Sequence, residues 1–447
     1  MEVIAFIVGV VVLVVGLAVS IALHEFGHLI PAKKFGVRVG QYMIGFGPTL
    51  WSRRIGETEY GVKALPLGGY ISMAGMYPPS PKELAAAASG SSAGRAGGGF
   101  FATMVQDARA ANDETLVNSE NDGVFYKLSV WKRVVIMLGG PVMNLLFAIV
   151  LFAILLSGIG VQTATTTIAT VSECVIPADE ARTTCEPGDP AAPAAAAGIL
   201  PGDVIMSVDG VEVATFADAS DIIRASAAQP LEIVVDRDGE MQTVRLTPTT
   251  AMRPVFDDDG VPIVDENGEP ELVEVGFAGI SPTVEYVQQP IWAGPQAAFE
   301  RVEAVAGIIW QLPVKVYEAG MTLVTGEERD PNGPLSVVGA GVVAGEIAAL
   351  DAPVLNRVAG MLSLLASLNI ALFVFNLIPL LPLDGGHIVV ALWEGIKRTW
   401  AKIFRLPEPK PVDATKLVPV TFVVVIGLMV MGGVLILADL FNPISLF

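Results

Sequence analysis

Charged residues and histidines are both scarce in this sequence, and each shortage narrows the possible classes of protein. Asp, Glu, Lys and Arg make up 16% of the 447 residues, whereas hydrophobic residues make up 52%. Soluble domains carry about 25% charged residues, so this composition indicates a membrane protein. The formal net charge of −19 argues against nucleic-acid binding, because phosphates demand a basic protein surface.

Four apolar stretches approach or exceed the ~20 residues needed to cross the hydrocarbon core of a bilayer. They run over Val3–Leu23, Val134–Leu156, Val358–Leu383 and Leu417–Leu437. The first stretch lacks the basic start and the small-residue cleavage site of a signal peptide, so we expect it to be a retained span. The sequence thus predicts a polytopic α-helical membrane protein with about four transmembrane helices.

The charges are segregated along the chain. Residues 31–132 contain 11 Lys or Arg against 8 Asp or Glu, whereas residues 158–355 hold 31 of the 46 acidic residues and only 8 of the 27 basic ones. Because basic short loops mark the cytoplasmic side, we expect a multi-pass protein of the plasma membrane. The loop after the third predicted span is also basic, with Lys397, Arg398, Lys402, Arg405 and Lys410. Both basic loops would be cytoplasmic, and both termini and the acidic segment would be extracytoplasmic.

Only two cysteines are present, Cys174 and Cys185, and both fall in the acidic segment. Disulfides persist in extracytoplasmic compartments. Sequence spacing fixes no geometry, so a disulfide and a pair of reduced thiols both stay open.

Glycine and β-forming residues dominate the stretch from Val37 to Met73, which predicts a small membrane-associated sheet or hairpin. Its glycines are expected to break it into short strands; they are Gly45, Gly47, Gly56, Gly68 and Gly69. Residues 78–122 are rich in Pro, Ala, Ser and Gly, a composition that cannot bury a core and predicts a flexible insertion.

Residues 162–250 predict a compact β-rich domain. The run Ala197–Ile205 contains Pro-Gly-Asp and leads to an Asp-Gly turn, and two strands follow, Leu231–Asp236 and Gln242–Leu246, joined by a turn at 237–240. This order resembles a single PDZ domain of the type found in bacterial proteases.

These features predict an order of segments along the chain. It comprises a first span (1–30), a membrane-associated β region (31–77), a flexible cytoplasmic insertion (78–127), a second span (128–158), the PDZ-like domain (162–250), extracytoplasmic strands and amphipathic helices (251–355), a third span (356–387), a basic cytoplasmic loop (388–415) and a fourth span (416–440).

The first span ends in the pattern His-Glu-x-x-His, formed by His24, Glu25 and His28. Residues four apart share one face of a helix, so both imidazoles can reach one metal ion. Glu25 lies beside the first histidine and can act as a general base on water. Ionisable groups near a bilayer are costly and mark function.

A catalytic zinc takes three protein ligands and keeps one open position. The chain has only three histidines, so the third ligand must be His387 or a carboxylate. Asp384 is the single acid at the end of a long apolar run and precedes two glycines. An unpaired carboxylate there would be expensive, and a metal would explain it.

Together these motifs resemble the site-2 protease family. His-Glu-x-x-His in the first span, Leu-Asp-Gly-Gly-His at 383–387 and the intervening PDZ-like domain carry the resemblance, and Gly139–Asn144 and Gly333–Ser336 add smaller similarities. The bacterial members that cleave anti-sigma factors and signal-peptide remnants are the closer match.

The resemblance implies a membrane-embedded zinc metalloendopeptidase. His24, His28 and Asp384 would hold Zn²⁺, Glu25 would activate water, and Asn376 would help position the substrate backbone. His387 is not assigned as a ligand. The glycine-rich strands would pair with an unfolded segment of a single-span membrane protein, either an anti-sigma factor or a signal-peptide remnant, within the lipid bilayer.

Two other classes of protein compete with this interpretation. A non-catalytic zinc-binding membrane scaffold with a partner-binding PDZ domain would need the same metal but not Glu25. A transporter would often show repeat symmetry, and the sequence contains no internal repeat.

Overall fold

The computed structural model describes residues 2–76, 123–176, 184–254, 272–327, 329–330, 333–407, 409, 412 and 417–444. These residues form two compact units, Met1–Ile159 with Pro290–Phe447, and Gly160–Gln289. We call them the membrane unit and the inserted unit. The predicted flexible insertion lies outside the described residues, except for its last residues, 123–127.

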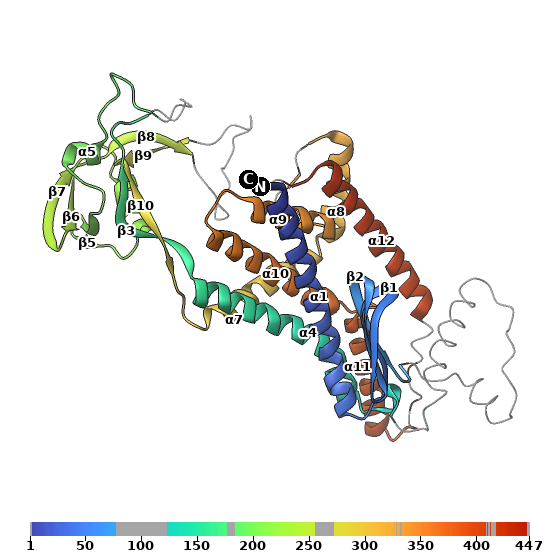
Figure 1. Cartoon of the computed structure of the whole chain (residues 1–447). Helices are drawn as coiled ribbons and strands as arrows, with labels where there is room; N and C mark the ends of the chain where they lie inside the picture. The colour runs from blue at the N-terminus through green and yellow to red at the C-terminus, as the bar shows by residue number, and fades with distance from the viewer. Residues whose placement is uncertain are drawn as a thin grey trace, which may run out of the picture. The chain divides into compact units, whose positions relative to one another are not determined.

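Within the part of the chain that the structure describes, four helices of the membrane unit are long and apolar enough to cross a bilayer, in agreement with the predicted number (Figure 1). They are α1 (Glu2–Lys34), α4 (Val130–Ala153) with its continuation η2 (Ile154–Ile159), α10 (Val354–Asn376) and α12 (Val418–Phe441).

The third span differs from its predicted course. Helix α10 ends at Asn376, a turn follows over residues 377–383, and a separate helix, α11 (Asp384–Ile403), then begins. Most of the predicted basic loop is therefore helical. The reason is that its charges are spaced along an amphipathic helix with a wide apolar face.

Small residues allow α1 to pack closely against its neighbours. A Cβ atom on Gly27 would lie 2.1 Å from the carbonyl oxygen of Gly139 in α4, and one on Gly139 would lie 2.0 Å from that of Gly27. Near its other end, α1 meets α9 (Val337–Ala349), where a Cβ on Gly9 would lie 2.2 Å from the oxygen of Ala344. Such contacts between backbones are typical of membrane helices, where packing drives association.

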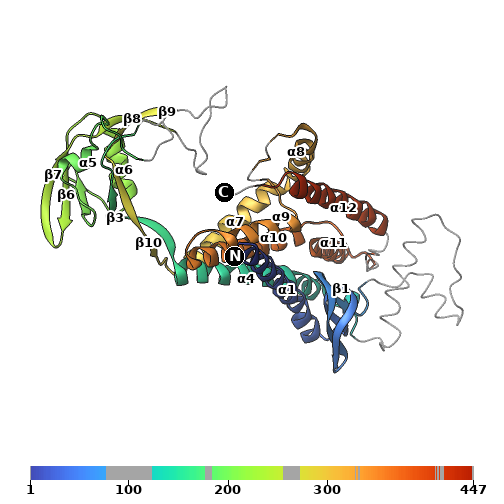
Figure 2. The same ribbon diagram turned by 45° about the horizontal axis from the view of Figure 1, so that its top comes forward.

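Two long antiparallel strands, β1 (Val39–Ile55) and β2 (Thr58–Met73), form a hairpin beside α1 (Figure 2). Gly56 lies in the turn between β1 and β2 and ends a strand as predicted, with a positive φ angle of 63°. The other four glycines lie within the strands, whose register shifts but which continue, contrary to the expectation of several short strands. Gly45 and Gly47 have positive φ angles of 93° and 84°, which only glycine adopts readily. The hairpin exposes large apolar side chains, namely Phe46, Leu50, Trp51, Ile55 and Leu65.

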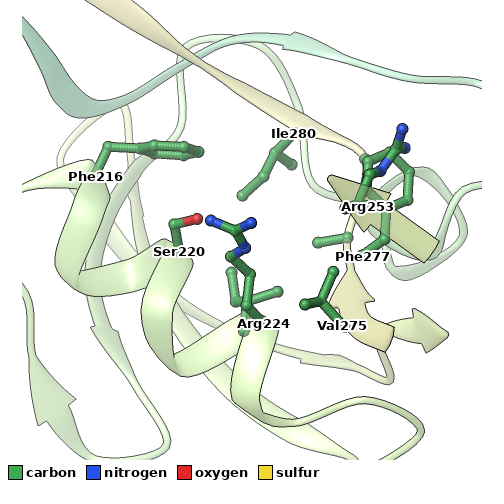
Figure 3. A pocket seen from close by; sticks show the side chains of 11 residues that line it. Phe216, Ser220, Arg224, Arg253, Val275, Phe277 and Ile280 are labelled. Atoms are coloured by element: carbon green, nitrogen blue, oxygen red, sulfur yellow. The ribbon is translucent and has the colours of Figure 1, made fainter. Parts of the chain in front are cut away.

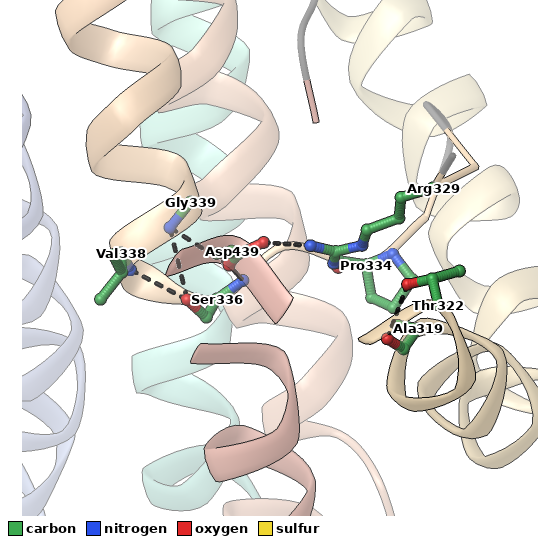
Figure 4. Close-up of polar contacts among 8 residues, drawn as sticks. All are labelled: Ala319, Thr322, Arg329, Pro334, Ser336, Val338, Gly339 and Asp439. Carbon is green, nitrogen blue, oxygen red and sulfur yellow. Dashed lines mark hydrogen bonds and ion pairs between the residues drawn. The ribbon is translucent and has the colours of Figure 1, made fainter. Parts of the chain in front are cut away.

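A buried ion pair joins α12 to the segment between α8 (Leu312–Thr325) and α9 (Figure 4). The Arg329 guanidinium donates to Asp439 and to the carbonyl of Pro334. Oδ2 of Asp439 accepts from the backbone N–H groups of Ser336, at 2.7 Å, and of Gly339, at 3.2 Å. The Gly333–Ser336 motif therefore starts α9 and binds a carboxylate at the positive end of that helix.

The inserted unit is built on a sheet of strand order β10-β3-β4-β6-β7, with β5 (Val211–Glu212) paired to β4. The bounds are β3 (Val161–Val171), β4 (Val204–Val208), β6 (Leu231–Arg237), β7 (Glu240–Leu246) and β10 (Ile280–Val287). The predicted turn at 237–240 is confirmed: Asp238 and Gly239 have positive φ angles of 53° and 87° between the paired strands β6 and β7.

Two helices complete this unit, α5 (Pro193–Ala197) and α6 (Phe216–Ala225). Helix α6 begins at a capping box of Thr215 and Asp218. Asp203 at the start of β4 is almost wholly buried and pairs with Arg237, whose Nε lies 2.7 Å from Oδ1. This guanidinium holds the pKa of the Asp203 carboxyl below its usual range.

The compact unit is larger than the predicted 162–250 domain. Strands β8 (Thr249–Pro254) and β9 (Leu272–Phe277) pair with each other, and β10 pairs with β3 along its length. Cys174 and Cys185 form a disulfide within the same unit, which settles the alternative that the sequence left open.

Candidate functional site

Three potential metal ligands converge where α1 meets the start of α11. Nε2 of His24 and Nε2 of His28 each lie 3.3 Å from Oδ2 of Asp384, and the two nitrogens lie 3.2 Å apart. Two ligands bound at roughly 2.0 Å with tetrahedral angles lie about 3.3 Å apart. The triangle of donor atoms therefore fits a zinc ion with three protein ligands and one open position.

Helix α1 supplies the two imidazoles from one face, as the spacing of four predicts. Nδ1 of the buried His28 lies 2.7 Å from the carbonyl oxygen of Ile136 in α4. An N–H at Nδ1 would donate to this carbonyl, which leaves the lone pair of Nε2 directed at the triangle. Second-shell bonds of this kind fix the tautomer and the orientation of a metal-binding histidine.

Asp384 is brought to the histidines by the turn between α10 and α11. A Cβ atom on Gly385 would lie 2.4 Å from the carbonyl oxygens of Leu377 and Ile378, and one on Gly386 would lie 2.6 Å from the amide nitrogen of Leu381. Both glycines are required because the turn folds back onto the first residues of α11. This explains the two glycines after the aspartate, for which the sequence suggested only an unusual backbone path.

Gly140 of α4 faces the same triangle. A Cβ atom there would lie 2.3 Å from Nε2 of His28 and 2.7 Å from Nε2 of His24. Any side chain would occupy the space beside the donor atoms. The sequence indicates the Gly139–Asn144 run only as a similarity to the family. Nothing in the sequence predicts that Gly140 lies beside the histidines.

We expect Gly140→Ala to weaken zinc binding by about tenfold or more, because the added methyl group would displace at least one imidazole. Loss of second-shell support alone costs a zinc site 10–100-fold. Zinc content of the purified full chain after dialysis measures the effect. Gly427→Ala in α12 is the matched control, since a Cβ there meets nothing within 4 Å. Equal zinc content in both variants would contradict the assigned role of Gly140.

Glu25 lies next to this triangle and is only 8% exposed. The β1–β2 hairpin covers it, since a Cβ on Gly69 would lie 3.0 Å from Cγ of Glu25 and 2.8 Å from a methyl group of Ile21. Tyr42 of β1 also donates a 2.7 Å hydrogen bond to the carbonyl of Ala22. The hairpin is thus fixed against the helix turn that carries the ionisable residues.

The structure places two further residues of the predicted site near this region. Asn376 is the last residue of α10, and its amide donates to the carbonyl of Leu372 at 2.9 Å. His387 lies in the first turn of α11, one turn beyond Asp384. The group of candidate metal ligands within 4.8 Å of one another contains His24, His28 and Asp384 and does not include His387.

Apart from the donor triangle, the inserted unit contains a cavity of about 380 Å³ between α6 and strands β8 to β10 (Figure 3). Phe216, Ile223 and Phe277 give it an apolar lining. Arg224 and Arg253 add two cations, and the Arg253 guanidinium stacks 4.7 Å from the ring centre of Phe277. The cavity suits an apolar group that carries a negative charge.

The helical membrane unit carries paired histidines and an aspartate that can hold a metal ion, which is the arrangement expected of a membrane metalloprotease. The chain belongs to peptidase family M50, the site-2 proteases, whose profile matches residues 12–404. Proteases of this family are zinc-dependent and act on membrane-embedded substrates.

The names of individual relatives are those of metalloproteases, in agreement with the family. The chain is 34% identical to "Zinc metalloprotease Rip1" of Mycobacterium tuberculosis, over 99% of each chain. It is 34% identical to the protein of the same name from Mycolicibacterium smegmatis, over 98% of this chain and 99% of the relative. "Metalloprotease MmpA" of Caulobacter vibrioides is 28% identical over 88% of each chain.

Proposed function

We propose that this chain is an intramembrane zinc endopeptidase in which His24, His28 and Asp384 hold the zinc and Glu25 is the general base. The convergence of three donor atoms at 3.2–3.3 Å, two from the membrane-spanning helix α1 and one from the start of α11, is the observation that carries this proposal. Zinc bound there would polarise the scissile carbonyl and lower the pKa of water to roughly 7.

Other residues of the chain would transfer the proton and hold the substrate. The Glu25 carboxylate accepts a proton from the attacking water and returns it to the leaving amine nitrogen. Asn376 would hold the substrate backbone. The exposed edge of the β1–β2 hairpin would pair with the substrate, because a helical segment must unwind before its peptide bond can be attacked.

The substrates of this proposal are single-span membrane proteins, namely anti-sigma factors or signal-peptide remnants. The apolar side chains on the hairpin, such as Leu50 (70% exposed) and Trp51 (58%), support a surface that meets lipid or a membrane segment. The alternative, a zinc-binding scaffold without catalysis, gives no reason for a buried glutamate beside the donor triangle. Cleavage of co-expressed single-span proteins by the wild type and by Glu25→Gln distinguishes the two.

For orientation, we propose that both termini and the inserted unit are extracytoplasmic. The acidic composition of 158–355 and the basic side chains of α11 support this arrangement. A membrane-impermeant thiol reagent applied to whole cells is expected to label Asp209→Cys and to leave Lys397→Cys unlabelled. The native cysteines give little background because they are paired. The reverse labelling pattern would overturn the orientation.

For the inserted unit, we propose a PDZ-like domain that acts as a size filter for substrates whose outside domains have been trimmed. Strand β3 contacts α6, and strand β10 of the same chain pairs with β3. A peptide ligand would therefore find the edge of β3 already occupied by β10. The cavity with Arg224 and Arg253 favours the second candidate, a docking site for partners.

Replacing residues 160–289 with a short linker separates these two roles. A filter predicts that the shortened protein cleaves untrimmed substrates that the full chain leaves intact. A docking site predicts slower cleavage of trimmed substrates, with untrimmed ones still intact. Gel analysis of co-expressed trimmed and untrimmed single-span proteins measures both outcomes, and the second would refute the filter.

A further inference from the structure

Two arginines share one carboxylate at the interface of α4 and α11. Nη1 of Arg133 donates to Oε2 of Glu394 at 3.1 Å, and Nη2 of Arg398 lies 2.7 Å from Oε1. The side chains of Glu394 and Arg133 are only 1% and 6% exposed. The cluster of these three residues, which we call the Arg–Glu–Arg cluster, therefore keeps one uncompensated positive charge.

Several donors of the cluster are unused. Nε and Nη2 of Arg133 and Nε of Arg398 are buried and have no hydrogen-bond partner among the described residues. A buried, unpaired cationic donor is costly, and the cost falls when an anion accepts from it. The cluster is thus suited to bind one further negatively charged group.

An apolar groove of about 840 Å³ runs along the same two helices, and Arg398 lines it. Val130, Trp131, Val134 and Val135 of α4 form one wall, while Leu392, Gly395, Ile396, Thr399, Trp400 and Ile403 of α11 form the other. Arg398 belongs to the cluster and also lines the groove, so the charged cluster and the apolar groove adjoin. Lys132, Lys397 and Lys402 add positive charge on these two helices.

From this combination we infer that the groove binds an anionic phospholipid. The groove is continuous with α4, a membrane-spanning helix, so acyl chains can lie on its valine and leucine side chains. The headgroup phosphate would accept from the guanidinium of Arg398, which lines the groove and is 34% exposed, and the excess positive charge of the cluster would attract it. Basic pockets between membrane helices recognise anionic headgroups in this way, and tryptophans favour the same interfacial depth.

The position of the groove gives the lipid a structural role. Helix α4 places Gly140 and the Ile136 carbonyl beside the histidines of the donor triangle, and α11 begins with Asp384. A lipid that contacts both helices would hold these contributions together. The bound lipid would thereby affect the geometry of the donor triangle without contacting its three residues.

The test uses the full chain in detergent and counts the lipid molecules that remain bound by native mass spectrometry. Phosphatidylglycerol and phosphatidylcholine with identical acyl chains are added in parallel. We expect one phosphatidylglycerol to bind at least fivefold more tightly than phosphatidylcholine. Arg398→Gln should remove most of this preference, since one basic residue near a membrane surface contributes about fivefold to anionic lipid binding. It leaves the buried Arg133–Glu394 pair intact, so the protein should still fold.

Two further variants complete the experiment. Gly395→Leu should reduce phosphatidylglycerol binding without removing charge, because its side chain fills the groove. Arg301→Gln, at an exposed arginine of α7 (Ala293–Ile309), is the matched control and should change nothing. The inference fails if both lipids bind equally, if Arg398→Gln and Gly395→Leu bind as the wild type does, or if 10 mM inorganic phosphate alone displaces the lipid.

Discussion

Glu25→Gln is expected to abolish cleavage of single-span substrates while the protein keeps its zinc. The substitution preserves the size of the side chain and leaves His24, His28 and Asp384 unchanged, but an amide cannot accept the proton of the attacking water. General acid–base catalysis contributes about 10²–10⁴-fold to such reactions, so the rate should fall by at least that range. Quantified cleavage of a reconstituted single-span protein, together with zinc content per chain, measures both parts of the prediction.

Glu346→Gln provides the control for this experiment. Glu346 is a partly buried glutamate on the apolar helix α9, so the variant carries the same chemical change away from the donor triangle. It should cleave at the wild-type rate. Substantial proteolysis by a folded, zinc-loaded Glu25→Gln protein would show that another group is the base.

Asp384→Ala is expected to strip most of the zinc from the purified protein. Its Oδ2 atom is one of the three donors that converge among the described residues, and losing a direct ligand should cost more than the 10–100-fold that loss of an outer-shell partner costs. We therefore expect zinc affinity to fall at least about 100-fold, from a wild-type content of about one zinc per chain. Elemental analysis after dialysis against a weak chelator measures the loss.

His387→Ala tests the choice of ligand directly. This histidine is the remaining one in the sequence and lies in the same helical turn as the glycines after Asp384. Its replacement should leave the zinc content near that of the wild type. If His387→Ala loses the metal and Asp384→Ala retains it, the ligand set proposed for the site is wrong.

Local sequence patterns were sufficient to predict the number of spans, because length and hydropathy are properties of each segment alone. The two histidines on one face of α1 follow equally directly from their spacing. The role of Asp384 as the third ligand could not be predicted from local sequence alone, because nothing local distinguishes it from His387. Its placement depends on the turn at 377–383, which the glycines allow but do not specify.

Other features depend on contacts between distant segments. Gly140 lies more than 100 residues from His28, and the Ile136 carbonyl carries no side-chain signal at all. The extent of the inserted unit was underestimated for a similar reason, because β10 pairs with β3 from the far end of that unit. Gly56 ends β1 as the sequence predicts, whereas bulges let the paired strands continue through Gly45, Gly47, Gly68 and Gly69.

The contact between Gly27 and Gly139 restricts how a substrate can reach the donor triangle. The two helix backbones are in contact here, so a substrate segment cannot pass between α1 and α4 at this level unless the helices separate. A lateral gate between these two helices would require this contact to separate, together with the His28–Ile136 hydrogen bond. We therefore expect a substrate to reach the donor triangle from another side, beside the β1–β2 hairpin or the turn at 377–383, while the contact between α1 and α4 stays closed.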